Sequence, residues 1–265
     1  MTQFVLSTDG TRIAYELIGA GRPALVLVHG WSCDRTYWNA QLESLSRDFT
    51  VVTVDLAGHG ESGCGREAWS IAAFGSDVAL VVTLNGLEDV VLVGHSMGGD
   101  VILEAARRLS TRVGGLIWVD TYSALPETGS SEDVQRRMGP FRANFAEETQ
   151  RFVRTMFGVD ADPSLVERIA RDMSAAPVDV ALGAMEAAWS FGPAVPALLS
   201  ELRLPLIAIN PNNSSTNVDS LHSYGIDVQL MPGVGHFPML ENPHAFTLQL
   251  LGAIKVLVER DGRSA

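Results

Sequence analysis

The chain has 265 residues, of which 46% are hydrophobic and 19% charged, a composition typical of a soluble globular protein with one large core. Its 31 acidic residues against 19 basic ones give a net charge of -12. Nucleic acids and anionic membrane surfaces repel such a chain, so neither is expected as a partner. Lys255 is the single lysine, which excludes a P-loop and leaves no other side chain for a Schiff base.

The number of cysteines and the first residues of the chain indicate the cellular compartment in which the protein is expected. Cys33 and Cys64 are too few for a disulfide-stapled secreted domain and are expected to be free thiols. Residues 1–7 show no basic stretch followed by a long apolar run, so no secretory signal is visible. No run of 18 apolar residues occurs, and a cytoplasmic location is expected.

Short apolar runs alternate with amphipathic stretches through the first half, the pattern of a mostly parallel sheet covered by helices. Asp9-Gly10 lies between two short apolar runs and predicts an N-terminal hairpin. Further strands are expected at residues 24–28, 50–54, 90–93, 116–119, 206–209 and 228–231. Helices are expected at residues 37–45, 71–84, 98–109 and 243–258. The predicted fold class is therefore α/β.

The rhythm changes in residues 122–202, where helical spacing continues without any strand-like run. We predict a helical cap, or lid, over residues 122–202, inserted into a core of residues 1–121 and 203–265. Most of its apolar side chains are expected to pack the helices onto the core and a minority to face a cavity; they include Phe141, Phe145, Phe152, Met156, Phe157, Met185, Trp189 and Phe191.

The strongest chemical signal is Gly94-His95-Ser96-Met97-Gly98 between a buried strand and a helical run. In this setting the serine occupies a sharp, strained turn, where side chains in place of the two glycines would clash. A serine hydroxyl is a poor nucleophile until a base takes its proton. If Ser96 is a nucleophile, the chain must therefore also supply a histidine and an acid that orients it.

These motifs resemble those of the α/β-hydrolase superfamily, and the resemblance covers nearly the whole chain. Besides the serine turn it includes His29-Gly30-Trp31, the run Asp-Leu-Ala-Gly-His-Gly-Glu-Ser at residues 55–62, and Gly-Val-Gly-His-Phe-Pro at residues 233–238. The resemblance implies an α/β-hydrolase fold, with a mostly parallel central sheet, an N-terminal hairpin and an inserted helical cap. It points to serine esterase or lactonase chemistry without any cofactor.

Of the six histidines, His236 is the predicted base, because the family directs the glycine-rich loop after the last strand back at the nucleophile. The other histidines are expected to hydrogen-bond within their loops, as for His29, His59 and His95, or to face solvent, as for His222 and His244. No cluster with zinc-ligand spacing is present in the sequence, so no metal is expected.

The third triad member departs from the common family pattern. Most relatives carry the acid after the strand equivalent to residues 206–209, but here residues 210–215 contain no carboxylate. Asparagine could fix the imidazole tautomer but could not stabilise the imidazolium. Some family members place the acid one strand earlier, where this chain has Asp120, which is our first choice; Asp219 is the alternative. Asp55 and Glu61 are expected to hold loop structure.

Two backbone N–H groups should stabilise the oxyanion that forms during attack on a carbonyl. By resemblance they belong to Trp31, after His-Gly, and Met97, after the nucleophile. The predicted substrate pocket comprises Trp31, Met97, Phe141, Phe145, Trp189 and Phe237.

The predicted function is hydrolysis of carboxylic esters of uncharged, partly apolar acyl substrates through an acyl-enzyme. A serine nucleophile argues against dehalogenase and epoxide-hydrolase chemistry, which in this family proceeds through a carboxylate. The closest alternative is an acyl lactone hydrolase, including hydrolysis of N-acyl-homoserine lactones. Carbon–carbon bond hydrolysis, perhydrolysis and a non-catalytic ligand-binding role follow. The expected partner is a small ester or lactone, and a homodimer is left open.

Overall fold

The computed structural model describes residues 1–125, 130–213 and 215–261. Eight strands form one sheet in the order β1-β2-β4-β3-β5-β6-β7-β8. β1 (Gln3–Leu6) and β2 (Arg12–Ile18) form an antiparallel hairpin, β2 also pairs antiparallel with β4, and the other pairings are parallel. The remaining strands are β3 (Ala24–Val28), β4 (Thr50–Val54), β5 (Val90–His95), β6 (Val113–Val119), β7 (Leu206–Pro211) and β8 (Ile226–Met231). The predicted α/β-hydrolase fold with an N-terminal hairpin is confirmed.

Helices cover both faces of the sheet. The chain winds in one direction from β3 through α1 (Asn39–Leu45) to β4, and in the other from β5 through α3 (Met97–Leu109) to β6. Because such crossovers are right-handed, this reversal places α1 and α3 on opposite faces. α2 (Ile71–Leu84) and α8 (Val195–Leu202) pack against α3, whereas α11 (Pro243–Asp261) packs against α1.

The central strands are apolar without alternation because both of their faces are covered. All residues of β3, β5 and β7 are buried. The expected helix at residues 37–45 divides into a 3-10 turn, η1 (Arg35–Trp38), and α1. The Asp34 side chain accepts the N–H of Thr36 and so caps the start of the 3-10 turn. Two further 3-10 turns are η2 (Ser110–Arg112) and η3 (Gly192–Ala194).

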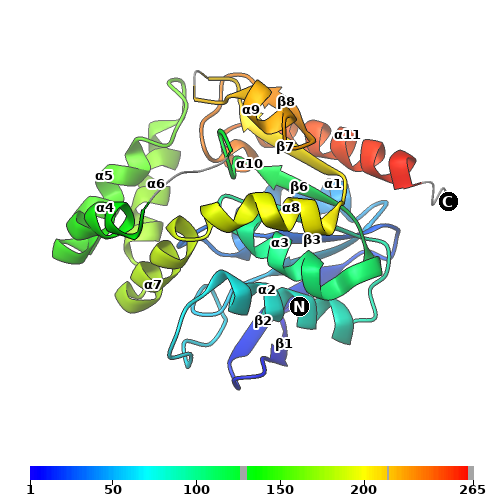
Figure 1. Cartoon of the computed structure of the whole chain (residues 1–265), viewed down its shortest axis with the longest axis horizontal. Helices are drawn as coiled ribbons and strands as arrows, with labels where there is room; N and C mark the ends of the chain where they lie inside the picture. The colour runs from blue at the N-terminus through cyan, green and yellow to red at the C-terminus, as the bar shows by residue number, and fades with distance from the viewer. Residues whose placement is uncertain (126–129, 214, 262–265) are drawn as a thin grey trace.

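Four helices precede α8 between β6 and β7, and the described part of residues 122–202 contains no strand. They are α4 (Ser131–Ala143), α5 (Phe145–Arg154), α6 (Pro163–Ser174) and α7 (Val178–Trp189). Figure 1 shows these four helices gathered to one side of the sheet, whereas α8 returns along α3. We refer to α4–α7 as the inserted helices. They lie beside the edge at which the parallel strands end.

That edge is where the chemistry-bearing residues emerge. The register aligns Val28 with Gly94, and Val119 with Ile209. The residues that follow β3, β5 and β6 therefore leave the sheet at one edge, the usual place for a ligand site in a parallel sheet. Two short helices complete this region after β7 and β8, namely α9 (Val218–His222) and α10 (Pro238–Glu241).

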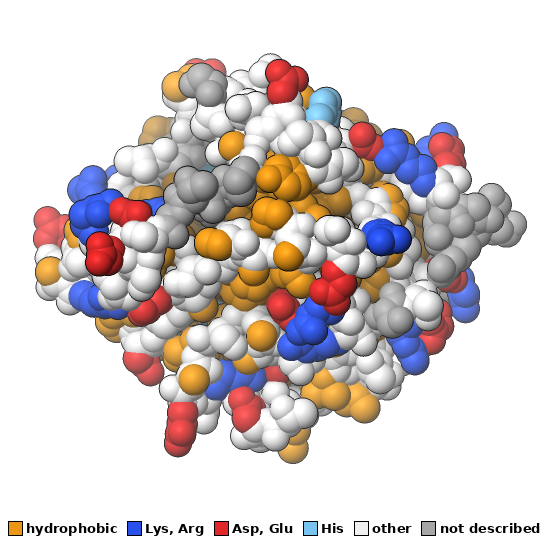
Figure 2. Space-filling model, in the orientation of Figure 1, with side chains coloured by type: hydrophobic (Ala, Val, Ile, Leu, Met, Phe, Trp, Pro, Cys, Tyr) orange, Lys and Arg blue, Asp and Glu red, His pale blue; other side chains and the backbone are white. Residues whose placement is uncertain are grey.

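The surface carries both signs of charge. On the face shown in Figure 2, most basic side chains lie beside acidic ones, with apolar areas between them. Ion pairs such as Arg154–Glu167 and Arg142–Glu186 link neighbouring helices in the same way. In the ranges that the structure describes, no helix is both long and apolar enough to cross a bilayer. Cys33 and Cys64 are free thiols, as predicted.

Candidate active site

Ser96 occupies a tight turn between β5 and α3. Its φ is +52°, a left-handed conformation that costs a non-glycine residue on the order of 1–3 kcal/mol. Backbone hydrogen bonds hold the turn: Ser96 N donates to Val119 O at 3.0 Å, and Gly99 N donates to Ser96 O at 2.8 Å. A Cβ at Gly94 would lie 2.3 Å from the carbonyl oxygen of Gly98, so a side chain there is excluded. The local packing therefore explains why this strained turn needs its glycines.

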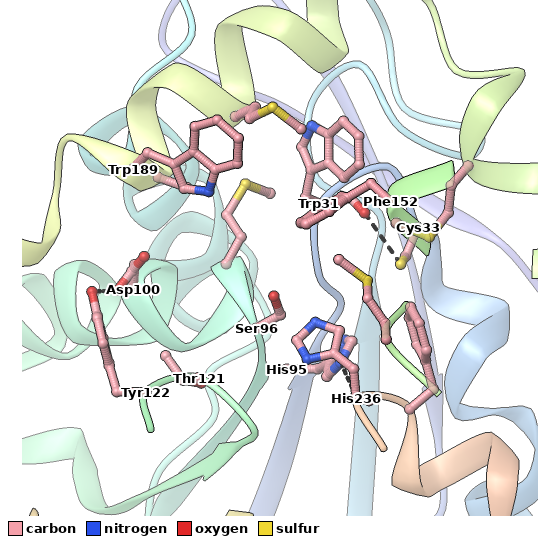
Figure 3. Close-up of a pocket in the computed structure, with 16 residues that line it drawn as sticks. Trp31, Cys33, His95, Ser96, Asp100, Thr121, Tyr122, Phe152, Trp189 and His236 are labelled. Atoms are coloured by element: carbon pink, nitrogen blue, oxygen red, sulfur yellow. Dashed lines mark hydrogen bonds between the residues drawn. The ribbon is translucent and has the colours of Figure 1, made fainter. Parts of the chain in front are cut away.

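His236 and Asp120 form a close pair beside Ser96. His236 Nδ1 lies 2.7 Å from Asp120 Oδ2, and both side chains are 20% exposed. Ser96 and His236 line the same cavity, and Figure 3 shows their side chains next to each other within it. An Nδ1–H that donates to Asp120 leaves Nε2 as the atom able to accept a proton. The loop after β8 and the end of β6 thus bring together the predicted base and the first-choice acid.

The alternative acid lies elsewhere. Asp219 is exposed on α9, and among the described residues the carboxylate partner of His236 is Asp120. In the segment of residues 210–215, where an acid was sought, Asn210 is buried near the end of β7, and its Nδ2 donates to Tyr122 O at 2.8 Å. Asn210 therefore supports the segment that follows Asp120 instead of contacting His236.

Glu241 organises the loop that carries His236. Its carboxylate accepts three backbone N–H groups, from Gly235 at 2.9 Å, Phe237 at 3.0 Å and Gly158 at 2.9 Å. His236 N in turn donates to Met156 O at 2.7 Å. Because residues 156–158 join α5 to α6, these bonds fix the His236 loop to the inserted helices. This contact was not predicted, since its donors are backbone groups that leave no sequence pattern.

His95 differs from its expected role. It was predicted to bond within its own loop, but its Nε2 lies 2.8 Å from the carbonyl oxygen of His236, and the two rings lie 4.7 Å apart. Burial, together with the neighbouring His236, holds the pKa of His95 well below its ordinary value, so its ring stays neutral. The prediction failed because the partner lies 141 positions away in the sequence.

The other histidines lie as predicted. His29 contacts the carbonyl of Gly30 and accepts the N–H of Leu56, and His59 contacts the carbonyl of Ala57. Burial lowers the pKa of His29 to about 4 and that of His59 to about 3. The remaining two, His222 and His244, are exposed.

Asp55 and Glu61 hold loop structure, as expected. The Asp55 carboxylate accepts the backbone N–H groups of Arg35 at 2.8 Å and Glu61 at 2.9 Å. The Arg35 guanidinium pairs with both acidic side chains. Neither acid is among the described residues that line the cavity.

Trp31 connects the core to the inserted helices. Its indole Nε1 donates to the carbonyl of Ala181 on α7 at 2.7 Å, and its ring packs edge-on against Phe141 and Phe145, each at 6.2 Å. The prediction that Phe141 and Phe145 line the pocket is therefore corrected, because neither is among the described lining residues and both support Trp31. Met97 is the first residue of α3, so its N–H has no acceptor within that helix.

The cavity measures about 220 Å³. Four predicted pocket residues line it, namely Trp31, Met97, Trp189 and Phe237. The structure adds apolar side chains of the inserted helices and the segment between them, namely Phe152, Met156, Met173, Met185 and Ala188. It also adds Cys33, His95, Asp100 and Thr121 of the core, and Tyr122, the first residue of the segment predicted as the insertion. Among the described residues, no three His, Cys, Asp or Glu side chains converge as a metal ion would require.

Comparison with known proteins defines the family. The sequence profile described as "Alpha/beta hydrolase family" matches residues 25–249. The chain therefore belongs to the α/β-hydrolase family.

Individual relatives are more distant. The chain is 27% identical over 257 residues to a pimeloyl-[acyl-carrier protein] methyl ester esterase of Pectobacterium atrosepticum, covering 89% of this chain and 96% of the relative. Other curated relatives match over a shorter region: an uncharacterized protein of Mycobacterium tuberculosis is 37% identical over 113 residues, 43% of this chain and 33% of that protein. A non-heme haloperoxidase of Rhodococcus erythropolis is 38% identical over 124 residues, 46% of this chain and 45% of the relative.

Solved structures share the whole architecture. A thermophilic esterase from Thermogutta terrifontis superposes with a TM-score of 0.82 at 26% identity, covering 97% of this chain and 99% of that one. Est816, described as an N-acyl homoserine lactone degrading enzyme, gives a TM-score of 0.78 at 20% identity, covering 94% of this chain and 99% of that one. The second likeness concerns the fold alone.

Proposed function

We propose that the protein is a serine hydrolase that cleaves carboxylic esters of uncharged, partly apolar acyl substrates through an acyl-enzyme. Ser96 is the nucleophile, His236 the general base and Asp120 the acid that orients it. The observation that carries the proposal is the 2.7 Å contact between His236 Nδ1 and Asp120 Oδ2 beside a serine on a strained turn in the same cavity.

The proposed reaction has two halves. His236 Nε2 takes the hydroxyl proton as Ser96 Oγ attacks the ester carbonyl, and the imidazolium then gives that proton to the departing alcohol. Water attacks the resulting acyl-enzyme through the same base and releases the acid. In the proposal, the backbone N–H groups of Trp31 and Met97 donate to the oxyanion, and loss of one such donor costs about 3 kcal/mol in comparable sites.

The cavity supports an uncharged, partly apolar substrate. Its walls are formed largely by aromatic and thioether side chains, and none of the described lining residues is an arginine or lysine. A substrate carboxylate would therefore meet no cation and would face Asp100. Ester cleavage also agrees with the names of two relatives, the Pectobacterium methyl ester esterase and the Thermogutta esterase.

Covalent labelling tests the nucleophile. A fluorophosphonate probe should modify Ser96, as read by mass spectrometry of the digested protein, and Ser96→Ala should abolish the adduct. Ser220→Ala is a matched control, because Ser220 lies on α9 outside the set of described cavity residues. A folded wild-type protein that stays unlabelled would favour the non-catalytic ligand-binding alternative.

A substrate series tests the reaction class. p-Nitrophenyl esters of increasing acyl length should be hydrolysed faster than a matched series of acyl lactones, measured as kcat/KM. Turnover of lactones with none of the open-chain esters would replace the ester assignment with the lactonase alternative.

A further inference from the structure

One wall of the cavity is polar and takes no part in the proposed reaction. It consists of Asp100, Thr121 and Tyr122. Figure 3 shows these three side chains on one side of Ser96, with His236 and Phe152 on the other. The nucleophile thus lies between a polar wall and a wall of aromatic and thioether groups.

The acidic group is built into this wall. Asp100 is only 4% exposed, and the Tyr122 hydroxyl donates to its Oδ1 at 2.7 Å. It stands in the first turn of α3, where the helix dipole favours a negative charge. Asp100 follows Ser96 by four positions, and both residues line the cavity. A buried carboxylate is costly without such stabilising groups.

We infer that this wall is a subsite for a hydrogen-bond-donating group of the substrate, a hydroxyl or an amide N–H. The inference rests on the proposed esterase function and narrows its substrate class. The two oxygens of the Asp100 carboxyl group together have several acceptor sites, so the group can receive a substrate donor in addition to the Tyr122 O–H. Hydrogen bonds to charged groups are the stronger kind, so a donor here should raise kcat/KM by about 10- to 100-fold.

A purely structural role predicts something different. The Asp100–Tyr122 bond also ties α3 to the segment after Asp120, which Asn210 holds from β7. If Asp100 only held that segment in place, its replacement would slow every ester by the same factor. A subsite makes the loss depend on whether the substrate carries the donor.

Two matched substrate pairs separate these roles. The first pair places the donor on the acyl side, p-nitrophenyl 3-hydroxybutyrate against p-nitrophenyl butyrate. The second places it on the alcohol side, 3-hydroxypropyl butyrate against propyl butyrate, followed by pH-stat titration. For each pair, the ratio of kcat/KM for the hydroxylated ester to kcat/KM for the plain ester is divided by the ratio of their rate constants for alkaline hydrolysis. This correction removes the difference in chemical reactivity between the two esters. The wild type should prefer the hydroxylated member of one pair, and that pair identifies the side of the ester that faces Asp100.

Asp100→Asn is the decisive variant, because asparagine keeps an acceptor for Tyr122 but loses the charge. The hydroxyl preference should fall by about 10-fold or more. Glu186→Gln, which removes a carboxylate of α7 outside the described cavity lining, should leave it unchanged. Equal losses for both members of each pair, or a wild type without any preference, would overturn the subsite. If Asp100→Asn does not fold, the test uses the wild type alone: a preference for the hydroxylated member of one pair supports the subsite, and no preference overturns it.

Binding without turnover keeps the inference separate from the proposed function. In Ser96→Ala, calorimetry with 3-hydroxypropyl butyrate, propyl butyrate and the two p-nitrophenyl esters measures the preference as a ratio of dissociation constants. A preference for the hydroxylated member of a pair that Asp100→Asn removes supports the subsite even if the fluorophosphonate fails to label wild-type Ser96. Equal dissociation constants within both pairs, with labelling intact, would overturn the subsite and leave the esterase proposal standing.

Discussion

The core and the inserted helices approach Ser96 with different kinds of contact. Core loops contribute polar side chains held by short hydrogen bonds, as in the His236–Asp120 pair. The inserted helices contribute flexible or flat apolar groups, such as Met173, Met185 and Trp189, which contact the cavity by packing alone. In our proposal the core supplies the reacting groups and the polar wall, and the insertion sets the preference for acyl-chain length, a division that substitutions on either side can test.

The largest effect should come from the acid. Asp120→Asn removes the negative charge that would stabilise the His236 imidazolium. Its amide can also donate to Nδ1, which favours the tautomer with the proton on Nε2, the atom that must accept the serine proton. The kcat on p-nitrophenyl butyrate should therefore fall by about 10⁴-fold. Asp219→Asn, on exposed α9, should stay near the wild-type rate. Unfolding temperatures that match the wild type would show that neither change acts through stability. A nearly active Asp120→Asn protein would reject the assignment.

Glu241 offers the next largest effect. Glu241→Gln replaces one carboxylate oxygen by an N–H group that faces backbone donors, so the loop around His236 should shift. We expect kcat to fall by about 10- to 100-fold with little change in KM. Steady-state kinetics provide the test, and Glu259→Gln on α11 is the matched control, because Glu259 is not among the described residues that line the cavity. A rise in KM at constant kcat would instead indicate a role in substrate binding.

The loss of folding stability at acidic pH should come from buried residues of the core, such as His29. In the folded protein the pKa of His29 is lowered to about 4, so between pH 6.5 and 4 the unfolded chain binds a proton that the folded chain does not. The free energy of unfolding should therefore fall as the pH decreases through this window, by about 3 kcal/mol for this residue. Denaturant titrations of His29→Gln should show a shallower pH dependence, and exposed His222→Gln should retain the wild-type slope. Equal slopes for all three proteins would contradict the prediction.

The smallest effect on reactivity should come from the inserted helices. Met185→Ala enlarges the cavity, so the ratio of kcat/KM for octanoate over butyrate p-nitrophenyl esters should rise several-fold, whereas kcat on the butyrate changes little. Met138→Ala is the matched control, because Met138 is buried on α4 but is absent from the described cavity lining. A large loss of kcat in Met185→Ala alone would undo the division between the two regions.

The core and the inserted helices also differ in how much of their structure the sequence could predict. The serine turn was recognisable because local backbone crowding requires glycine at positions 94 and 98. Asp120 could be proposed because residues 210–215 offered no carboxylate and some members of the resembled family place the acid one strand earlier. The first prediction depends on a short-range constraint, and the second depends on the family resemblance.

The contacts of the inserted helices leave no comparable local pattern in the sequence. Helical spacing shows which face of α4 or α5 is apolar, but apolar partners lie both behind Trp31 and around the cavity. Phe141 packs edge-on against both Trp31 and Phe152, whereas Phe152 also borders the cavity. Only the three-dimensional arrangement tells these two phenylalanines apart. Phe152 and Met156 both line the cavity, but Met156 lies beyond the end of α5, so a helical spacing of four residues could not have identified them as a pair.

The position of Asp120 has an evolutionary consequence. In the proposed triad the carboxylate follows β6, so the chain after β7 does not have to supply it. There the buried amide of Asn210 supports Tyr122 from behind, a task that tolerates change in the residues that follow it. We expect homologous sequences to vary in length and composition after β7, while the interval from Val119 to Tyr122 resists substitution.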